Sequence, residues 1–233
     1  MSVSTVLYAL MAGITPSLIW LYFWTREDNH PEPKHLLAAC FLGGMLAVVF
    51  AIFGEKYIYD SIKDPENRYI IWAILEELLK FITVIAITIK SKYNDEPIDM
   101  MIYCITVALG FSALENTFFI MGPLANGQVV QSIITGNMRF IGATLVHVVS
   151  SSLIGFSLGY AFYRGWFAKF IYSVIGLGMA ISLHAAFNLS IINIGSDNIL
   201  KTFIWIWITV VIMIILFEEI KAVGPSKPNK LFN

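Results

Sequence analysis

The chain has 233 residues, of which 58% are apolar and only 13% are charged, and its formal net charge is −1. Soluble domains carry about 25% charged residues, so this composition indicates a membrane protein. The balanced charge and the absence of a long basic run disfavour nucleic acid as a partner. The first positive charge is Arg26, so the N-terminus lacks the basic region of a signal peptide, and the first apolar run is expected to remain as a membrane span.

Seven apolar windows along the chain are long enough to cross a bilayer, which takes about 20 residues. Each is expected to be a helix, because lipid cannot hydrogen-bond free backbone groups. The windows are 3–24, 36–54, 69–89, 98–122, 140–163, 167–194 and 199–217. The sequence therefore predicts an all-α, polytopic transmembrane helix bundle. We expect a single transmembrane domain over residues 1–221 and a polar, flexible cytoplasmic tail over residues 222–233.

The lysines and arginines near the ends of these spans are distributed unequally between the two sides of the bundle. With the N-terminus outside, nine lie on the inner side and five on the outer side. Cytoplasmic loops are enriched in Lys and Arg. The N-terminus is therefore expected to lie outside and the C-terminus in the cytoplasm.

Ionisable side chains lie well inside four of the expected spans. They are Glu76, Glu77, Lys80, Glu115, His147 and His184. A charge at the bilayer centre costs at least about 2.5 kcal/mol, so such residues indicate function more often than packing. At about 1.5 Å per residue they lie roughly 10–15 Å from the span ends. Because successive helices alternate in direction, all of them fall in one leaflet, the outer one, and we expect them to form one site.

This combination of residues suits the activation of water. One glutamate can act as general base, and a histidine or Asn188 can hydrogen-bond an oxyanion. His184 and Asn188 are four residues apart, so their side chains share one helix face. The same site could instead bind a divalent metal such as zinc, with Glu115, His147 and His184 as candidate ligands. No two of these ligands share the short helical spacing of HExxH sites, which slightly favours a metal-free site.

Several short motifs resemble the PrsW family of bacterial intramembrane proteases, and more distantly the CAAX-processing and bacteriocin-immunity membrane proteases. The motifs are "EELLK" (76–80), "FSALEN" (111–116), the stretch from "RF" to His (139–147), "HAAFN" (184–188) and the acidic first loop "REDNHPEPK" (26–34). The resemblance implies a multi-pass enzyme of the bacterial cell membrane. It further implies that the substrate is a single-pass membrane protein such as an anti-sigma factor, which receives its first cut here in regulated proteolysis during a stress response. The expected depth of the site and the expected topology place this cut near the outer face.

The resemblance also implies roles for individual residues. The expected catalytic residues are Glu76, Glu77, His147, His184 and Asn188, and the expected supporting residues are Lys80, Glu115, Asn116 and Arg139. It does not decide between a metal-dependent and a glutamate-only mechanism, so no cofactor is assigned at this point.

Two other classes of function use similar residues. A proton- or metal-coupled transporter also buries Glu, His and Lys, but transporters often have repeated halves and a site at the bilayer midplane. The chain has no internal repeat, and its expected site is off-centre. An inactive relative that shields or assembles partners would be expected to lack some members of the site, and here none is missing. A protease is therefore the favoured interpretation.

Overall fold

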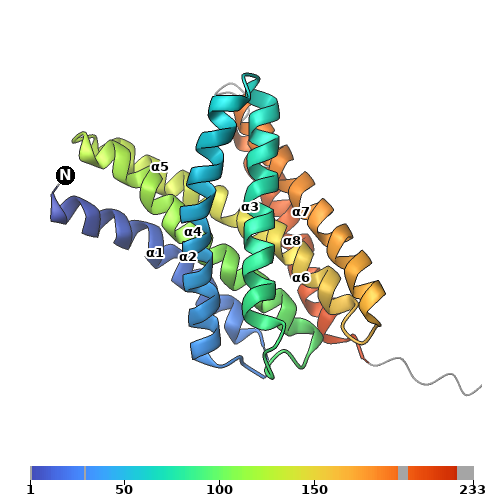
Figure 1. The fold of residues 1–233 in the computed structure, drawn as a ribbon. Helices are drawn as coiled ribbons and strands as arrows, with labels where there is room; N and C mark the ends of the chain where they lie inside the picture. Colours follow the sequence, from blue (N-terminus) through green and yellow to red (C-terminus); the bar gives the residue numbers. More distant parts are fainter. Residues whose placement is uncertain (1, 29, 194–198, 225–233) are drawn as a thin grey trace, which may run out of the picture.

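The computed structural model describes residues 2–28, 30–193 and 199–224, and this part of the chain contains helices and no strand. The helices are α1 (Val3–Arg26), α2 (Lys34–Ser61), α3 (Pro65–Thr88), α4 (Pro97–Ala125), α5 (Val129–Ile141), α6 (Ala143–Tyr160), α7 (Trp166–Asn193) and α8 (Ile199–Lys221). Figure 1 shows α2 and α3 side by side, with α1 and α5 extending away from them at one flank. The predicted all-α bundle is confirmed.

Capping residues determine where α3 and α4 begin, the two helices that carry Glu76, Glu77 and Glu115. Asp64 accepts a hydrogen bond from the backbone N–H of Asn67, and Pro65 occupies the first helical position of α3. At the start of α4, the Asp99 side chain accepts the backbone N–H groups of Asp95 and Glu96 at 2.8 and 2.6 Å. These caps satisfy N–H groups that a helix end leaves unbonded, and they fix where α3 and α4 begin.

Helix α4 is the centre of the bundle and packs against α1, α2 and α6. Nearly every residue from Pro97 to Ala113 is buried, because this segment is apolar or small on all sides. Glycines allow the neighbouring backbones to approach it closely: a Cβ on Gly44 of α2 would collide with the carbonyl of Val107, and one on Gly155 of α6 would collide with Met101. This close packing brings helices from both sides of α4 within reach of its side chains.

Within the described part of the chain, six segments are long and apolar enough to cross a membrane, and α5 and α6 together form one of them. Helix α3 is not among the six, because Glu76, Glu77 and Lys80 lie in its middle. Its 24 residues nevertheless measure about 36 Å, enough to span the hydrocarbon core. We therefore count α3 as the seventh span.

The structure differs from the expected spans mainly at two places. Helix α2 continues to Ser61 instead of ending near residue 54, because Glu55 and Lys56 interrupt the apolar run but not the helix. The sequence left the segment before residue 140 unassigned, whereas the structure forms the 13-residue helix α5 there. At about 20 Å, α5 is too short to span the membrane alone, and it meets α6 at Gly142.

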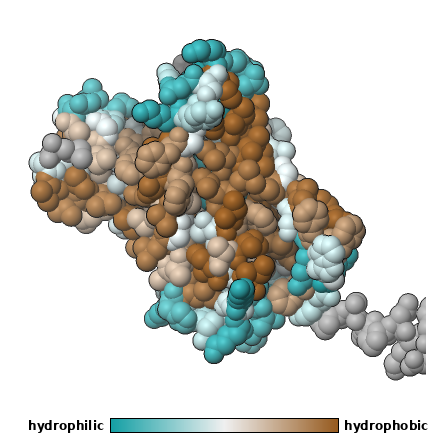
Figure 2. Space-filling view, in the orientation of Figure 1, coloured by the Kyte–Doolittle hydropathy of each residue, from teal (hydrophilic) through white to brown (hydrophobic). Residues whose placement is uncertain are grey.

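The outside of the bundle carries a broad apolar surface. Figure 2 shows hydrophobic residues over the middle of the molecule and hydrophilic residues concentrated at its two ends. Large side chains such as Phe53, Phe170 and Trp205 are 71%, 61% and 68% exposed, which suits contact with lipid. These features agree with a multi-pass membrane protein. The side on which the N-terminus lies stays a prediction, and the predicted tail lies outside the described residues beyond Gly224.

Candidate active site

Four helices bring the intramembrane ionisable residues together. Helix α3 supplies Glu76, Glu77 and Lys80, α4 supplies Glu115, α6 supplies His147 and α7 supplies His184. All except Glu115 are buried, and the rings of the two histidines lie 5.0 Å apart in an edge-to-face arrangement. Hereafter these six residues are called the catalytic cluster.

Glu77 lies at the centre of the cluster, with its side chain fully buried. One carboxylate oxygen accepts hydrogen bonds from Lys80 Nζ at 2.6 Å and from His184 Nδ1 at 2.8 Å. The other oxygen accepts the hydroxyl of Ser151 at 3.3 Å. Both oxygens of Glu77 therefore have hydrogen-bond partners, and its expected catalytic role stays a prediction.

The two histidines are each held by a carboxylate through one ring nitrogen. Glu77 accepts Nδ1–H of His184, which leaves the Nε2 lone pair facing Glu76. Glu115 accepts Nε2–H of His147 at 2.9 Å, which leaves the Nδ1 lone pair facing the interior of the cluster. Such carboxylate–histidine pairs fix the ring orientation and tautomer of metal-binding histidines.

His147 Nδ1 lies 3.0 Å from Lys80 Nζ. This nitrogen and His184 Nε2 also approach Glu76. Its oxygen Oε2 lies 3.8 Å from His184 Nε2 and 3.9 Å from His147 Nδ1. This oxygen is buried and has no hydrogen-bond partner among the described residues. One ligand atom from each of the three residues lies within 4.8 Å of the other two. Two imidazoles and a carboxylate form a known zinc ligand set, so Glu76, His147 and His184 fit a divalent metal ion.

Glu115, which the sequence analysis named as a candidate metal ligand, occupies a different position. Its oxygen Oε2 forms an ion pair with Arg139 of α5 at 2.6 Å and accepts the hydrogen bond from His147. Arg139 Nε also donates to Asn116 Oδ1 at 2.6 Å, and its guanidinium stacks 3.8 Å from the centre of the Phe119 ring. Glu115 and Arg139 are 20% and 16% exposed, so the cluster approaches the surface at this edge.

The carboxyl groups in and beside the cluster outnumber the cations that contact them. Glu55 of α2, which the sequence analysis missed because it follows the end of the expected second span, interacts with Glu76 and Glu115. Glu55 therefore joins the three carboxylates of the cluster, and Lys80 and Arg139 are the cations that contact them. If these groups are ionised and the histidines neutral, the formal charge is −2. A divalent cation would neutralise it.

Asn188 is less closely integrated. It lies one turn after His184 on α7, is half-buried, and makes no side-chain hydrogen bond among the described residues. Its expected role at an oxyanion stays a prediction. Asn116, by contrast, donates to Thr144 at 2.9 Å and to Ser112 at 3.2 Å, and so ties Arg139 to α6. Ser112 and Thr144 were not expected from the sequence, because isolated hydroxyl residues in apolar helices carry no distinctive signal.

The chain is similar to known proteins over most of its length. A family model described as "PrsW family intramembrane metalloprotease" matches residues 32–219. "Protease PrsW" of Geobacillus kaustophilus is 30% identical over 157 residues, which cover 65% of this chain and 66% of that protein. "Protease PrsW" of Bacillus subtilis is 24% identical over 184 residues, which cover 77% of this chain and 80% of that protein. No solved structure matches the chain.

Proposed function

We propose a mechanism from the premise that the chain belongs to the PrsW family of intramembrane metalloproteases, which are hydrolases. In this proposal the chain hydrolyses a peptide bond of a membrane-embedded protein at the catalytic cluster. The observation that carries the proposal is the convergence of His147 and His184 on the unpaired, buried oxygen of Glu76. A transporter would not require this arrangement of ligands with an open position, and the family match favours hydrolysis.

Glu76, His147 and His184 would hold the metal, which supplies Lewis acidity toward a bound water and the scissile carbonyl. The slight preference of the sequence for a metal-free site is therefore not kept, because the family is one of metalloproteases and the ligands come from three different helices. Of the glutamate pair, Glu76 has the free oxygen and touches the reacting groups. Glu77 holds His184, and its charge is compensated by Lys80.

Lys80 has a second contact that bears on metal binding. Its ammonium lies 3.0 Å from His147 Nδ1, the nitrogen that faces Glu76. In the absence of a metal the ammonium occupies this lone pair. A metal ion and Lys80 would therefore compete for His147, and Lys80 would retain its stronger contact with Glu77 at 2.6 Å.

Two further features of the sequence support the class of substrate and the place of cleavage. The motif resemblance supports a single-pass membrane protein, in the manner of an anti-sigma factor that receives its first cut here. The Lys/Arg distribution supports cleavage near the outer face. Single cysteines introduced at Asn126 and Lys92 test the orientation: an impermeant reagent should label Asn126→Cys in intact cells and leave Lys92→Cys unlabelled. The reverse pattern would place the site near the inner face.

The deciding experiment measures metal content and cleavage together in the purified protein. We expect about one divalent metal per chain, lost in Glu76→Gln and in His184→Ala, and retained in Asn188→Ala. Glu218→Gln is the matched control, because Glu218 is a 60% exposed carboxylate at the end of α8. Cleavage of a single-pass reporter that survives complete metal removal would contradict the metal-dependent form, and a wild-type protein that cleaves no single-pass reporter would contradict the function.

A further inference from the structure

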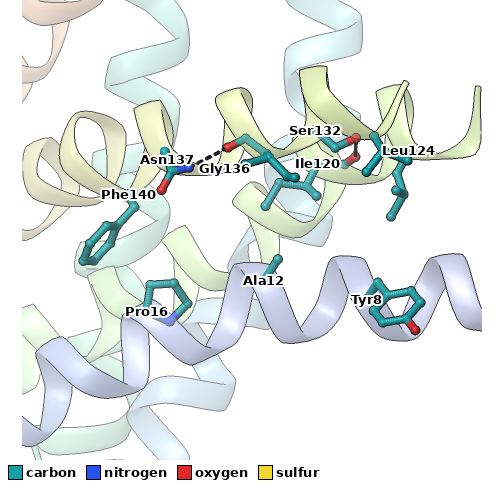
Figure 3. A pocket seen from close by; sticks show the side chains of 11 residues that line it. Tyr8, Ala12, Pro16, Ile120, Leu124, Ser132, Gly136, Asn137 and Phe140 are labelled. Atoms are coloured by element: carbon teal, nitrogen blue, oxygen red, sulfur yellow. Dashed lines mark hydrogen bonds between the residues drawn. The ribbon is translucent and has the colours of Figure 1, made fainter. Parts of the chain in front are cut away.

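An apolar groove lies between α1 and α5, beside the end of α4 (Figure 3). It encloses about 550 Å³. Tyr8 lies at one end, Pro16 and Phe140 lie at the other, and Ile120 of α4 forms part of its floor. Helices α1 and α5 flank the groove, and both expose large apolar side chains, such as Tyr8 at 67% and Ile133 at 59%. Whatever fills the groove in a membrane must therefore be apolar.

Close packing within the protein explains Gly13 of α1 but does not explain Gly136 of α5. Gly13 of α1 is tightly constrained, because a Cβ there would collide with Thr117 of α4. Gly136 of α5 is not, because a Cβ there would meet only the end of the Ile120 side chain at 3.4 Å. Gly136 and Ala12 leave space on the groove side of their helices. Small residues of this kind allow a further helix to approach closely in a membrane.

The position of the groove favours a peptide occupant over a lipid chain. Phe140 directly follows Arg139, which forms the ion pair with Glu115 at the exposed edge of the catalytic cluster. Helix α5 therefore contributes both to the groove and to that edge of the cluster. The groove also contains the exposed Asn137, whose amide N–H donates to the backbone of Ile133 and whose oxygen accepts no bond within the described part of the chain. A peptide side chain can donate to that oxygen, whereas an acyl chain cannot.

We propose that this groove docks the transmembrane helix of the substrate, with the helix end that precedes the cleaved bond at Phe140. This inference rests on the proposed proteolytic function and adds the place where the substrate is held. Helix α5 then links substrate binding to the active site. Its groove side binds the substrate helix, and Arg139 on the same helix contacts Glu115 of the catalytic cluster. Because the cluster is buried, access requires Arg139 to move away from Glu115, and a helix lying along α5 is placed to cause that movement.

Photo-crosslinking tests the location directly. The probe is a synthetic single-pass peptide of about 21 Leu and Ala residues with flanking lysines, reconstituted with the full-length protein in liposomes. A photoreactive phenylalanine is placed at Ile133 in the groove or at Phe53 on the lipid-facing side of α2. We expect at least about fivefold more peptide adduct from Ile133. Equal adducts at both positions, or adducts with phospholipid alone at Ile133, would overturn the proposal.

Filling the groove provides the second test. The same single-pass peptide, now carrying a fluorescent label, reports binding in liposomes. Gly136→Phe should weaken its binding by about tenfold. Gly178→Phe is the matched control, because Gly178 lies on the exposed face of α7 with no atom within 4 Å of an added Cβ, and it should leave binding unchanged. If Gly136→Phe does not fold, as judged by its thermal transition, Ala12→Leu replaces it. Unchanged binding would refute the groove. Neither test requires cleavage or metal, so failure of the proposed function remains distinguishable.

Discussion

Helix α4 carries Asp99 in its first turn and Glu115 in its second half. The carboxylates around these two residues have different partners. Glu115 belongs to the catalytic cluster, where Lys80, Arg139 and two histidines surround the carboxylates. Asp99, about 24 Å away along the helix, lies beside Glu32, and Asp28 is near. In the described part of the chain no Lys or Arg forms an ion pair with Asp28, Glu32 or Asp99. We call these three residues the loop cluster.

The two clusters differ in which groups their carboxylates contact. In the loop cluster, Asp99 accepts two backbone N–H groups and thereby caps α4, a structural task that needs no cation. Burial raises the pKa of Glu32 above its ordinary value. In the catalytic cluster, cations and imidazoles compensate most of the carboxylates and leave one oxygen of Glu76 free. Asp28 Oδ2 and Glu32 Oε2 of the loop cluster are also buried without a hydrogen-bond partner among the described residues, but only the Glu76 carboxylate lies with two histidines in a group that could hold a metal ion.

The largest expected difference between the clusters is in catalysis. Glu76→Gln should lower the rate of reporter cleavage by at least about 10²-fold, because it removes the charged ligand on which both histidines converge. Asp99→Asn should leave the rate near that of the wild type. Cleavage assays on equal amounts of folded protein make the measurement. If Asp99→Asn were as inactive as Glu76→Gln, the division into a chemical and a structural cluster would be wrong.

The next largest effect concerns stability. Lys80→Met leaves Glu77 buried without its cation, and breaking a buried pair costs about 3–5 kcal/mol. Lys221→Met breaks the exposed pair with Glu218 and should cost at most about 1 kcal/mol. Denaturant unfolding in detergent gives both values. The double variant Lys80→Met/Glu77→Gln should recover part of the loss. Equal losses for Lys80→Met and Lys221→Met would show that the Glu77 charge is not held by Lys80.

A smaller effect is expected at the exposed edge of the catalytic cluster. Arg139→Gln removes the ion pair that positions Glu115, which in turn orients His147, so kcat/KM should fall by about tenfold. The cost in stability should be about 1 kcal/mol or less, because the pair is partly exposed. Arg68→Gln is the control, since Arg68 stacks on Tyr59 away from the cluster. An Arg139→Gln enzyme with unchanged kcat/KM would remove Arg139 from the mechanism.

The smallest effect is a pH dependence at the loop cluster. Because the folded-state pKa of Glu32 is raised, the folded protein binds more protons than the unfolded chain between the ordinary pKa and the raised one. The contribution of Glu32 to the unfolding free energy is therefore most favourable below about pH 4.5 and declines as the pH rises through the raised pKa. Glu32→Gln should flatten this decline. A steeper decline in the variant would mean that Glu32 is held charged.

Much of the fold and part of the catalytic cluster followed from the sequence alone. Lipid admits only helices with satisfied backbones, so apolar length determined the spans, and charges such as Glu76 inside those spans indicated a site. Alternating helix direction placed the members of the site at one depth. Helix α5 was not predictable in this way, because its 13 residues are too short for the apolar signal of a span. Glu55 escaped notice because it lies near the end of a helix.

Only the tertiary structure decided which atoms meet. Sequence spacing makes Glu76 and Glu77 equivalent, since each is within one helical turn of Lys80. In the packed bundle, Glu77 contacts Lys80 of its own helix and His184 of α7. The free oxygen of Glu76 faces both histidines. Likewise, Glu115 contacts Arg139 of α5 and His147 of α6 rather than a neighbour in sequence, and it lies outside the group that could hold a metal ion. Such choices depend on how separate helices pack, which local sequence does not encode.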